Sequence, residues 1–166
     1  DKARALIRQQ CGREDIDVQF LVGGTQTNLT VIAATLRPHQ GVISADTGHI
    51  NVHETGAVEA TGHKVIALPS ADGKLTAQQV LDCYHEHWND ATHEHIVQPG
   101  MVYISNPTEI GSIYHKSELQ ALAEACRECG LPLFMDGARL GYGLAAQDND
   151  LDLPTITDCC DVFYIG

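Results

Sequence analysis

The chain is poor in basic residues and has no long apolar run. Lys and Arg number 10 against 22 Asp and Glu, which gives a formal net charge of −12 at pH 7. Nucleic acids and anionic membranes bind basic surfaces, so this composition disfavours both as partners. No apolar stretch approaches the ~20 residues of a membrane-spanning helix. The given start also lacks the basic and then apolar segments of a signal peptide. We therefore expect a soluble protein.

The chain also lacks the regular cysteine spacing of a disulfide-stabilised domain. Six cysteines in a chain of 166 residues, without a repeated interval, do not form such a framework. We interpret them as reduced thiols in a cytoplasmic protein. They are Cys11, Cys83, Cys126, Cys129, Cys159 and Cys160.

Low-complexity tracts, internal repeats and linkers are absent as well. The 166 residues are 43% hydrophobic, which is typical of one globular domain. Continuous apolar strands alternating with helices predict a three-layer α/β/α domain with a mostly parallel sheet. The predicted strands are 18–22, 41–45, 63–68, 101–105, 133–136 and 161–165; the predicted helices are 27–36, 50–60, 76–88 and 117–130, with a loop at 106–114.

The chain stops at Gly166, where a predicted strand also stops. Ligands of parallel sheets bind at the carboxyl ends of the strands, and a domain rarely finishes there. We therefore interpret residues 1–166 as an incomplete domain from a longer protein.

A glycine- and threonine-rich turn, Gly23 to Asn28, follows the first predicted strand and opens a helix. Glycines let the backbone approach an anion, and a helix N-terminus offers free N–H groups and the positive end of a dipole. Gly24 and Thr25 are thus candidate phosphate-binding residues. The turn is neither a Walker loop nor a GxGxxG motif, and Gly and Thr also cap ordinary strand-to-helix turns. Both interpretations stay open.

His49 follows the predicted strand 41–45, so we expect it near the same edge of the sheet. A neutral imidazole there could stack on a flat cofactor ring, although a histidine in a loop is commonly plain polar surface. His49 and His53 are spaced i, i+4, but no third metal ligand is evident. The segment HINVHE is not the HExxH of zinc proteases. We predict no metal site.

The strand 133–136 ends in Asp136-Gly137-Ala138-Arg139. An acid at a strand end can hold a protonated pyridine nitrogen, and an Arg can bind a carboxylate with two hydrogen bonds. The alternative is a helix N-cap with an exposed salt bridge of little energetic value.

Together these motifs resemble the threonine aldolase / β-eliminating lyase family of pyridoxal-phosphate enzymes, which has the aminotransferase-like large-domain fold. The resemblance covers nearly the whole chain. It rests on the order of the motifs: the Gly-Thr turn, His49 five residues before Glu54-x-Gly56, the loop 106–114, and then Asp136 to Arg139.

The resemblance implies a lyase that uses pyridoxal 5′-phosphate and cleaves a β-hydroxy-α-amino acid, such as threonine, to glycine and an aldehyde. Residue by residue, it implies that Gly24 and Thr25 bind the phosphate and that His49 stacks on the pyridine ring. Asp136 would hold the pyridinium nitrogen, and Arg139 would bind the substrate carboxylate. It also implies a homodimer or homotetramer.

The chain departs from this family at Glu109. Threonine aldolases usually carry a His in the loop that matches Thr108 to Gly111, near the substrate hydroxyl. Because Glu can also accept a proton, Glu109 becomes a candidate catalytic base, while recognition of the substrate hydroxyl differs from that in threonine aldolases.

The resemblance also places a Schiff-base lysine a few residues after strand 161–165, beyond Gly166. The four lysines present, Lys2, Lys64, Lys74 and Lys116, do not stand at that position. The stretch 1–166 alone is therefore expected to be inactive, because it lacks the nucleophilic amine.

Two alternatives to the aldolase hypothesis remain. An aminotransferase or a β-eliminating lyase would use the same scaffold. A non-enzymatic thiol- or metal-binding protein would use Cys126-x-x-Cys129 and the His-rich segments 85–87 and 93–95. The second is disfavoured because the CxxC lies near a helix end, whereas redox motifs of this type open a helix.

Overall fold

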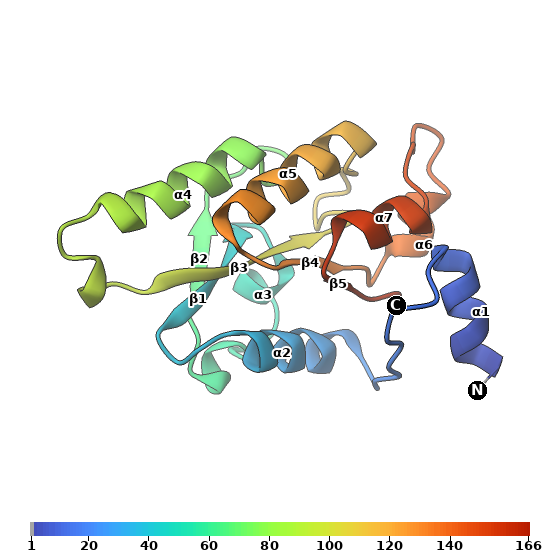
Figure 1. Ribbon diagram of the computed structural model, residues 1–166, viewed down its shortest axis with the longest axis horizontal. Helices are drawn as coiled ribbons and strands as arrows, with labels where there is room; N and C mark the ends of the chain where they lie inside the picture. Colours follow the sequence, from blue (N-terminus) through green and yellow to red (C-terminus); the bar gives the residue numbers. More distant parts are fainter. Residues whose placement is uncertain (1) are drawn as a thin grey trace.

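A five-stranded sheet forms the centre of the molecule, in the order β2-β1-β3-β4-β5. The computed structural model describes residues 2–166 (Figure 1). Every strand pair within this range is parallel, as the sequence predicts. The strands are β1 Gln40–Ala45, β2 Val65–Leu68, β3 Gln98–Ser105, β4 Leu133–Asp136 and β5 Val162–Phe163.

Helices cover both faces of the sheet, which confirms the three-layer α/β/α prediction. Helices α4, α5 and α7 lie on one face, and α2 and α3 lie on the other (Figure 1). No helix among the described residues has both the length and the apolar character to cross a membrane. The α-helices are α1 Lys2–Cys11, α2 Gly24–Thr35, α3 His49–Val52, α4 Ala77–Asn89, α5 Lys116–Cys129, α6 Leu140–Leu144 and α7 Leu153–Cys159, with 3₁₀ turns η1 Glu59–Thr61 and η2 His93–His95.

Each face of the sheet has its own hydrophobic core. Val42 packs with Ile32 of α2 in one core, while its neighbour Ile43 packs with Leu119 of α5 in the other. Successive side chains of a strand point to opposite faces, so strands with apolar residues at every position need cover on both sides. The apolar runs of the sequence therefore predict the layered fold.

Two predicted elements are wrong. Residues 18–22 are extended but unpaired, and Val22 is 95% exposed. The Val18 carbonyl accepts a hydrogen bond from Arg4 Nε at 2.8 Å. The predicted helix 50–60 stops after Val52, because Thr55 (φ 52°) and Gly56 (φ 77°) adopt left-handed conformations that end a helix.

Other boundaries follow the predictions closely. Thr76 caps α4 by accepting a hydrogen bond from Gln79 N at 3.2 Å, as its position before an amphipathic run indicates. Helix α5 ends at Gly130, whose φ of 65° is left-handed. The strand predicted at 161–165 is limited to Val162–Phe163.

The carboxyl ends of the strands bring the candidate residues to one edge. Asp136 is the last residue of β4, and its register partner on β3 is Ser105. His49 begins α3, four residues after β1 ends, and Glu109 follows four residues after β3 ends. A parallel sheet therefore places three distant segments beside each other.

Candidate functional site

Asp136 is buried, with 3% of its surface exposed, and its carboxylate accepts four hydrogen bonds. The Oδ2 atom accepts from the Tyr103 hydroxyl at 2.6 Å and from Asn28 Nδ2 at 3.0 Å. The Oδ1 atom accepts from the Tyr164 hydroxyl at 2.6 Å and from the Ala138 backbone N–H at 2.9 Å. No Lys or Arg forms an ion pair with Asp136 within the described part of the chain.

Both tyrosines are held as neutral donors. Burial raises the pKa of Tyr103 well above its usual range, and the negative charge of Asp136 adds to this effect. Burial and the hydrogen bond to Asp136 raise the pKa of Tyr164 in the same way. Both hydroxyls therefore donate to the carboxylate throughout the physiological pH range.

A second buried carboxylate, Glu54, lies next to Asp136. Asn28 Nδ2 joins the two, because it donates to Glu54 Oε1 at 2.6 Å as well as to Asp136. Glu54 Oε1 also contacts His49 Nδ1 at 2.7 Å, which fixes the orientation of the imidazole ring. The remaining acceptors, Glu54 Oε2 and Asn28 Oδ1, are buried without a hydrogen-bond partner among the described residues. Buried polar atoms are nearly always hydrogen-bonded, so these two acceptors call for a partner such as a water molecule or a ligand.

Glu109 and Arg139 form an ion pair beside this cluster. Arg139 Nη2 donates to Glu109 Oε1 at 3.1 Å and to the Pro107 carbonyl at 3.2 Å. The Ser105 hydroxyl donates to the same Glu109 oxygen at 2.8 Å. The Arg139 side chain is 38% exposed, so part of the guanidinium faces solvent. Arg139 is thus held by two acceptors and remains partly open to solvent.

The N-terminus of α2 lies at the same site. The helix begins at Gly24, so the first backbone N–H groups, including that of Thr25, have no acceptor within the helix. A Cβ atom on Gly24 would lie 2.7 Å from the Tyr164 hydroxyl oxygen, which itself bonds to Asp136. Gly24 therefore lets the start of the helix approach the acid closely. An anion bound there would lie a few ångströms from Asp136.

These features fit a flat cofactor with a basic ring nitrogen and an acidic group. The carboxylate of Asp136 suits a protonated ring nitrogen, and the start of α2 suits a phosphate. The ring of His49 is 35% exposed and lies beside them, oriented by Glu54. The acceptors of Glu54 and Asn28 that lack a partner among the described residues are compatible with a polar ligand in this place.

A metal ion suits the site less well. Ligand atoms of His49, Glu54 and Asp136 lie within 4.8 Å of one another, a spacing that a metal can bridge. However, each oxygen of Asp136 already accepts two hydrogen bonds, and His49 Nδ1 is directed at Glu54. The arrangement favours a hydrogen-bonded network over a metal centre.

Comparison with known proteins identifies the family. The family model described as beta-eliminating lyase matches residues 2–166. This chain belongs to that family. The resemblance found in the sequence is therefore confirmed.

Curated relatives and solved structures agree with this assignment. The low specificity L-threonine aldolase of Pseudomonas aeruginosa is 32% identical over 139 residues, which cover 82% of this chain and 39% of the relative. A structure described as threonine aldolase of Leishmania major superposes with a TM-score of 0.94 at 50% identity, over 99% of this chain and 47% of that one. This chain thus spans less than half the length of these relatives.

More distant structures confirm the fold alone. The aspartate aminotransferase of Thermus thermophilus superposes with a TM-score of 0.54 at 21% identity, over 70% of this chain and 28% of that chain. The predicted aminotransferase-like scaffold is therefore correct.

Most of the predicted site residues are joined into one hydrogen-bonded network. On one side of Asp136, hydrogen-bonded contacts lead through Asn28 and Glu54 to His49. On the other side, close polar contacts lead through Tyr103, Ser105 and Glu109 to Arg139. Gly24 and Thr25 adjoin it at the start of α2. Sequence reasoning missed Asn28, Glu54, Tyr103 and Tyr164 as members of the site. Tyr103 and Tyr164 lie near the carboxyl ends of strands, Asn28 lies in the first turns of α2, and Glu54 belongs to the Glu54-x-Gly56 motif, but none of these signals assigns a role in the site.

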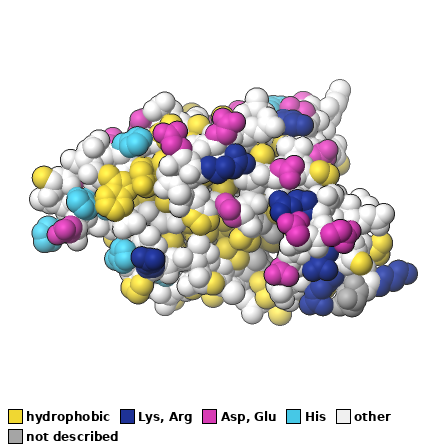
Figure 2. Space-filling model, in the orientation of Figure 1, with side chains coloured by type: hydrophobic (Ala, Val, Ile, Leu, Met, Phe, Trp, Pro, Cys, Tyr) yellow, Lys and Arg dark blue, Asp and Glu magenta, His cyan; other side chains and the backbone are white. Residues whose placement is uncertain are grey.

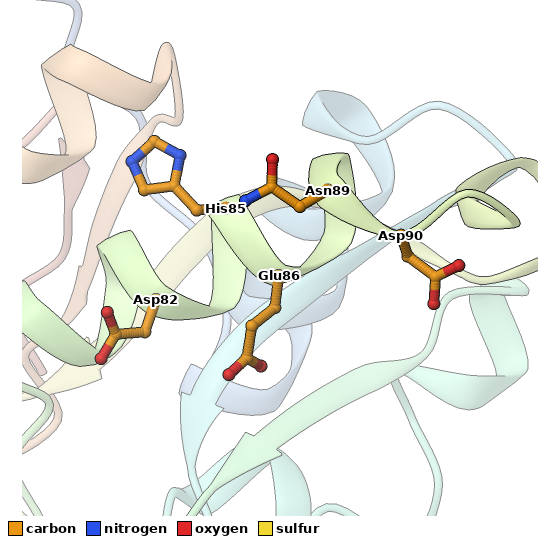
Figure 3. A pocket seen from close by; sticks show the side chains of 5 residues that line it. All are labelled: Asp82, His85, Glu86, Asn89 and Asp90. Atoms are coloured by element: carbon orange, nitrogen blue, oxygen red, sulfur yellow. The ribbon is translucent and has the colours of Figure 1, made fainter.

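The His-rich segments do not form a metal site with converging ligands. His85 is exposed and His87 is buried, as expected for residues two apart on a helix. In Figure 3, His85 and Glu86 point to different sides of α4. Histidines gather around a hydrophobic patch at the end of the molecule where α4 leads into β3 (Figure 2). There His87 and His93 pack against Trp88, with ring centroids 5.0 and 5.2 Å away. The cluster is an aromatic packing contact.

The cysteines are free thiols in the structure, and the CxxC pair is buried at the end of α5. Burial raises the pKa of Cys126 to about 12, and it raises the pKa of Cys160 well above its usual range. Because the thiolate is both the nucleophile and the metal ligand, these thiols are poorly suited to redox or zinc chemistry.

We therefore expect Cys126 and Cys160 to resist thiol reagents. A pKa of about 12 instead of 9.0 lowers the thiolate fraction of Cys126 near neutral pH by about a thousandfold. A chromogenic disulfide reagent should label Cys126 and Cys160 slowly in the folded protein and label all cysteines rapidly in denaturant. In the folded protein, the labelling rate of Cys126 should rise as the pH approaches 12. Rapid labelling, or stoichiometric zinc in the purified protein, would restore the thiol- or metal-binding alternative.

Proposed function

We propose that this chain is the cofactor-binding part of a pyridoxal-phosphate-dependent lyase that cleaves a β-hydroxy-α-amino acid to glycine and an aldehyde. The observation that carries the proposal is the buried Asp136, placed beside both the N-terminus of α2 and the ring of His49. The names of the relatives, which are threonine aldolases, support the reaction class.

Each residue has a definite task in this proposal. The backbone N–H groups of Gly24 and Thr25 bind the phosphate, and His49, held by Glu54, stacks on the ring. Asp136 keeps the ring nitrogen protonated, since a nearby anion favours the charged form. Arg139 binds the substrate carboxylate with the part of its guanidinium that is not engaged by Glu109.

When bound, pyridoxal phosphate supplies an electron sink for the bond that breaks at the substrate Cα. Glu109 then removes the proton of the β-hydroxyl group, which releases the aldehyde. Its Oε2 atom is buried and has no hydrogen-bond partner among the described residues, so it has an acceptor to offer to the substrate hydroxyl. Arg139 holds the substrate so that the Cα–Cβ bond is oriented for cleavage.

We further propose that the lysine that holds the cofactor covalently follows Gly166, and that residues 1–166 belong to a large domain completed elsewhere in the protein. Borohydride treatment of the full-length protein with pyridoxal phosphate should leave the cofactor on one lysine beyond Gly166, as peptide mass mapping would show. A folded protein without such an adduct would exclude the cofactor chemistry.

Product analysis separates the reactions available to this scaffold. Glycine and an aldehyde from a β-hydroxy-α-amino acid would support aldol cleavage. A keto acid with ammonia would indicate β-elimination, and a keto acid formed only with an amino acceptor would indicate transamination. If a keto acid forms without glycine, the proposed aldol cleavage is wrong and the protein is a β-eliminating lyase or an aminotransferase.

We also propose that the full-length protein is a homodimer or a homotetramer. Phe20, Leu21 and Val22 are exposed apolar residues directly before the start of α2. A contiguous exposed apolar segment beside a ligand site is typical of an interface. Light scattering on a sizing column should give the mass of two or four chains, and a monomer would contradict the proposal.

Replacing Glu109 by Gln is expected to lower kcat for aldol cleavage by roughly 10²- to 10⁴-fold, because a positioned general base contributes about that much. KM should change little, since the amide can still accept the hydrogen bond from Arg139. Steady-state kinetics of E109Q against the exposed control E128Q would show the effect. A raised KM with an unchanged kcat would instead make Glu109 a positioning residue for Arg139.

A further inference from the structure

The hydrogen-bonding capacity of Asp136 is full. Each carboxylate oxygen has two lone pairs, and each accepts two hydrogen bonds: Oδ2 from Tyr103 and Asn28, and Oδ1 from Tyr164 and the Ala138 N–H. A ring nitrogen that binds Asp136 as a fifth donor would need one of these four to leave. The identity of the leaving donor then becomes a structural question.

Three of the four donors are fixed. Asn28 is fully buried, and it also donates to Glu54. Tyr103 lies within β3, is 1% exposed and packs against Phe134 with ring centroids 5.7 Å apart. The Ala138 N–H belongs to the backbone of the turn that follows β4. Moving any of these donors would disturb the core or the turn.

Tyr164 differs from the other three. It is only partly buried and follows β5, the strand at the edge of the sheet. Its ring borders a cavity of about 770 Å³, which Gly24 also lines but Asp136 does not. Tyr164 thus stands between this cavity and the acid. Its ring also packs against Phe134, with centroids 6.3 Å apart, so rotation of the side chain toward the cavity would expose Asp136 Oδ1 at the cost of this contact.

The Tyr164 hydroxyl lies beside two groups that the proposed function assigns to the cofactor. The oxygen lies 2.6 Å from Asp136 Oδ1 and 2.7 Å from where a Cβ atom of Gly24 would be. It therefore occupies space next to both Asp136 Oδ1 and the start of α2. A ring nitrogen that approaches Oδ1 would compete with this hydroxyl.

We infer that Tyr164 is the exchangeable donor of Asp136, whose hydroxyl bonds Oδ1 before the cofactor binds and is displaced by the ring nitrogen of pyridoxal phosphate. This inference rests on the proposed function, because it presumes that cofactor. Tyr164 is accordingly a positioning residue that keeps the buried carboxylate hydrogen-bonded, and cofactor binding has to break its bond to Asp136.

Tyr164→Phe tests the exchange, because it removes the competing hydroxyl and keeps the ring. In the full-length protein stripped of cofactor, Y164F should bind pyridoxal phosphate about tenfold more tightly and faster, since one hydrogen bond to a charged group no longer has to be broken. Absorbance of the bound cofactor gives the affinity and rate without any assay of turnover. Y142F is the matched control, because Tyr142 is 79% exposed and should leave binding unchanged.

The outcomes separate this inference from the proposed function. If neither the wild type nor Y142F binds pyridoxal phosphate, the proposed function fails and the exchange fails with it. If both bind and Y164F binds equally or more weakly, only the exchange is overturned, since a purely structural role of Tyr164 predicts weaker binding. If Y164F does not fold, Y164L serves as the second variant and should show the same gain in affinity; equal or weaker binding by Y164L would overturn the exchange.

Discussion

Replacing Gly137 by Ala is expected to destabilise the folded protein by about 3 kcal/mol, a large effect for the addition of one methyl group. The new Cβ atom would overlap the backbone carbonyl oxygen of Tyr164. The Gly137 carbonyl also accepts a hydrogen bond from Gly166 N at 3.0 Å, so the turn after β4 and the segment after β5 are in direct backbone contact. Backbone atoms cannot move aside as a flexible side chain can, so the two segments would have to separate.

Gly141→Ala is the matched control for this change. Gly141 lies in α6, and an added Cβ atom there meets no atom within 4 Å. Alanine should stabilise this helix by about 0.5–1 kcal/mol, because glycine loses more backbone entropy on folding. The denaturant concentration at the midpoint of unfolding should fall for G137A and rise for G141A. Equal stability of G137A and the wild type would show that β4 and β5 do not pack as described.

Asp136→Asn is expected to lower cofactor affinity and turnover by roughly 10²- to 10⁴-fold, which corresponds to the cost of about 3–5 kcal/mol for removing one partner of a buried ion pair. The amide carries no charge to keep the ring nitrogen protonated. It also turns an N–H₂ group toward hydroxyl and N–H donors, so two of the four hydrogen bonds to this side chain lose their acceptor.

Binding of pyridoxal phosphate and product formation by the full-length D136N protein would measure both effects. Asp82→Asn is a suitable control, since Asp82 is exposed on α4 and accepts a hydrogen bond only from Gln78 among the described residues. Circular dichroism would show whether D136N still folds. A folded D136N protein with turnover within a few fold of the wild type would remove Asp136 from the proposed chemistry.

The layered fold was predictable because its signals are local. Strands such as 41–45 and 101–105 consist of apolar residues at successive positions, and only a strand covered on both faces buries all of them. Residues 18–22 show the same pattern but stay unpaired, since pairing depends on a neighbouring strand that the local sequence does not reveal. The early end of α3 was missed for a different reason: the left-handed conformation of Thr55 is not evident from its residue type.

The candidate residues of the site were also predictable, but their partners were not. Asp136 ends a strand, and His49 and Arg139 follow strands within four residues, at the sheet edge where ligands of parallel sheets bind. Asn28 and Tyr103 carry no motif, and they are 108 and 33 residues away from the acid that they contact. Contacts of that range are made by packing between elements, so a linear pattern does not identify them.

By itself, the sequence determined the class of fold, the edge of the sheet that carries the site, and the residue types at each strand end. These follow from hydrophobic periodicity and from the chemistry of individual side chains, which are local properties. Only the tertiary structure decided that the acid is already saturated by four donors, and that one of them, Tyr164, also borders a cavity. The reason is physical: hydrogen-bond saturation depends on the three-dimensional meeting of α2, β3, β4 and β5, and no single segment contains that information.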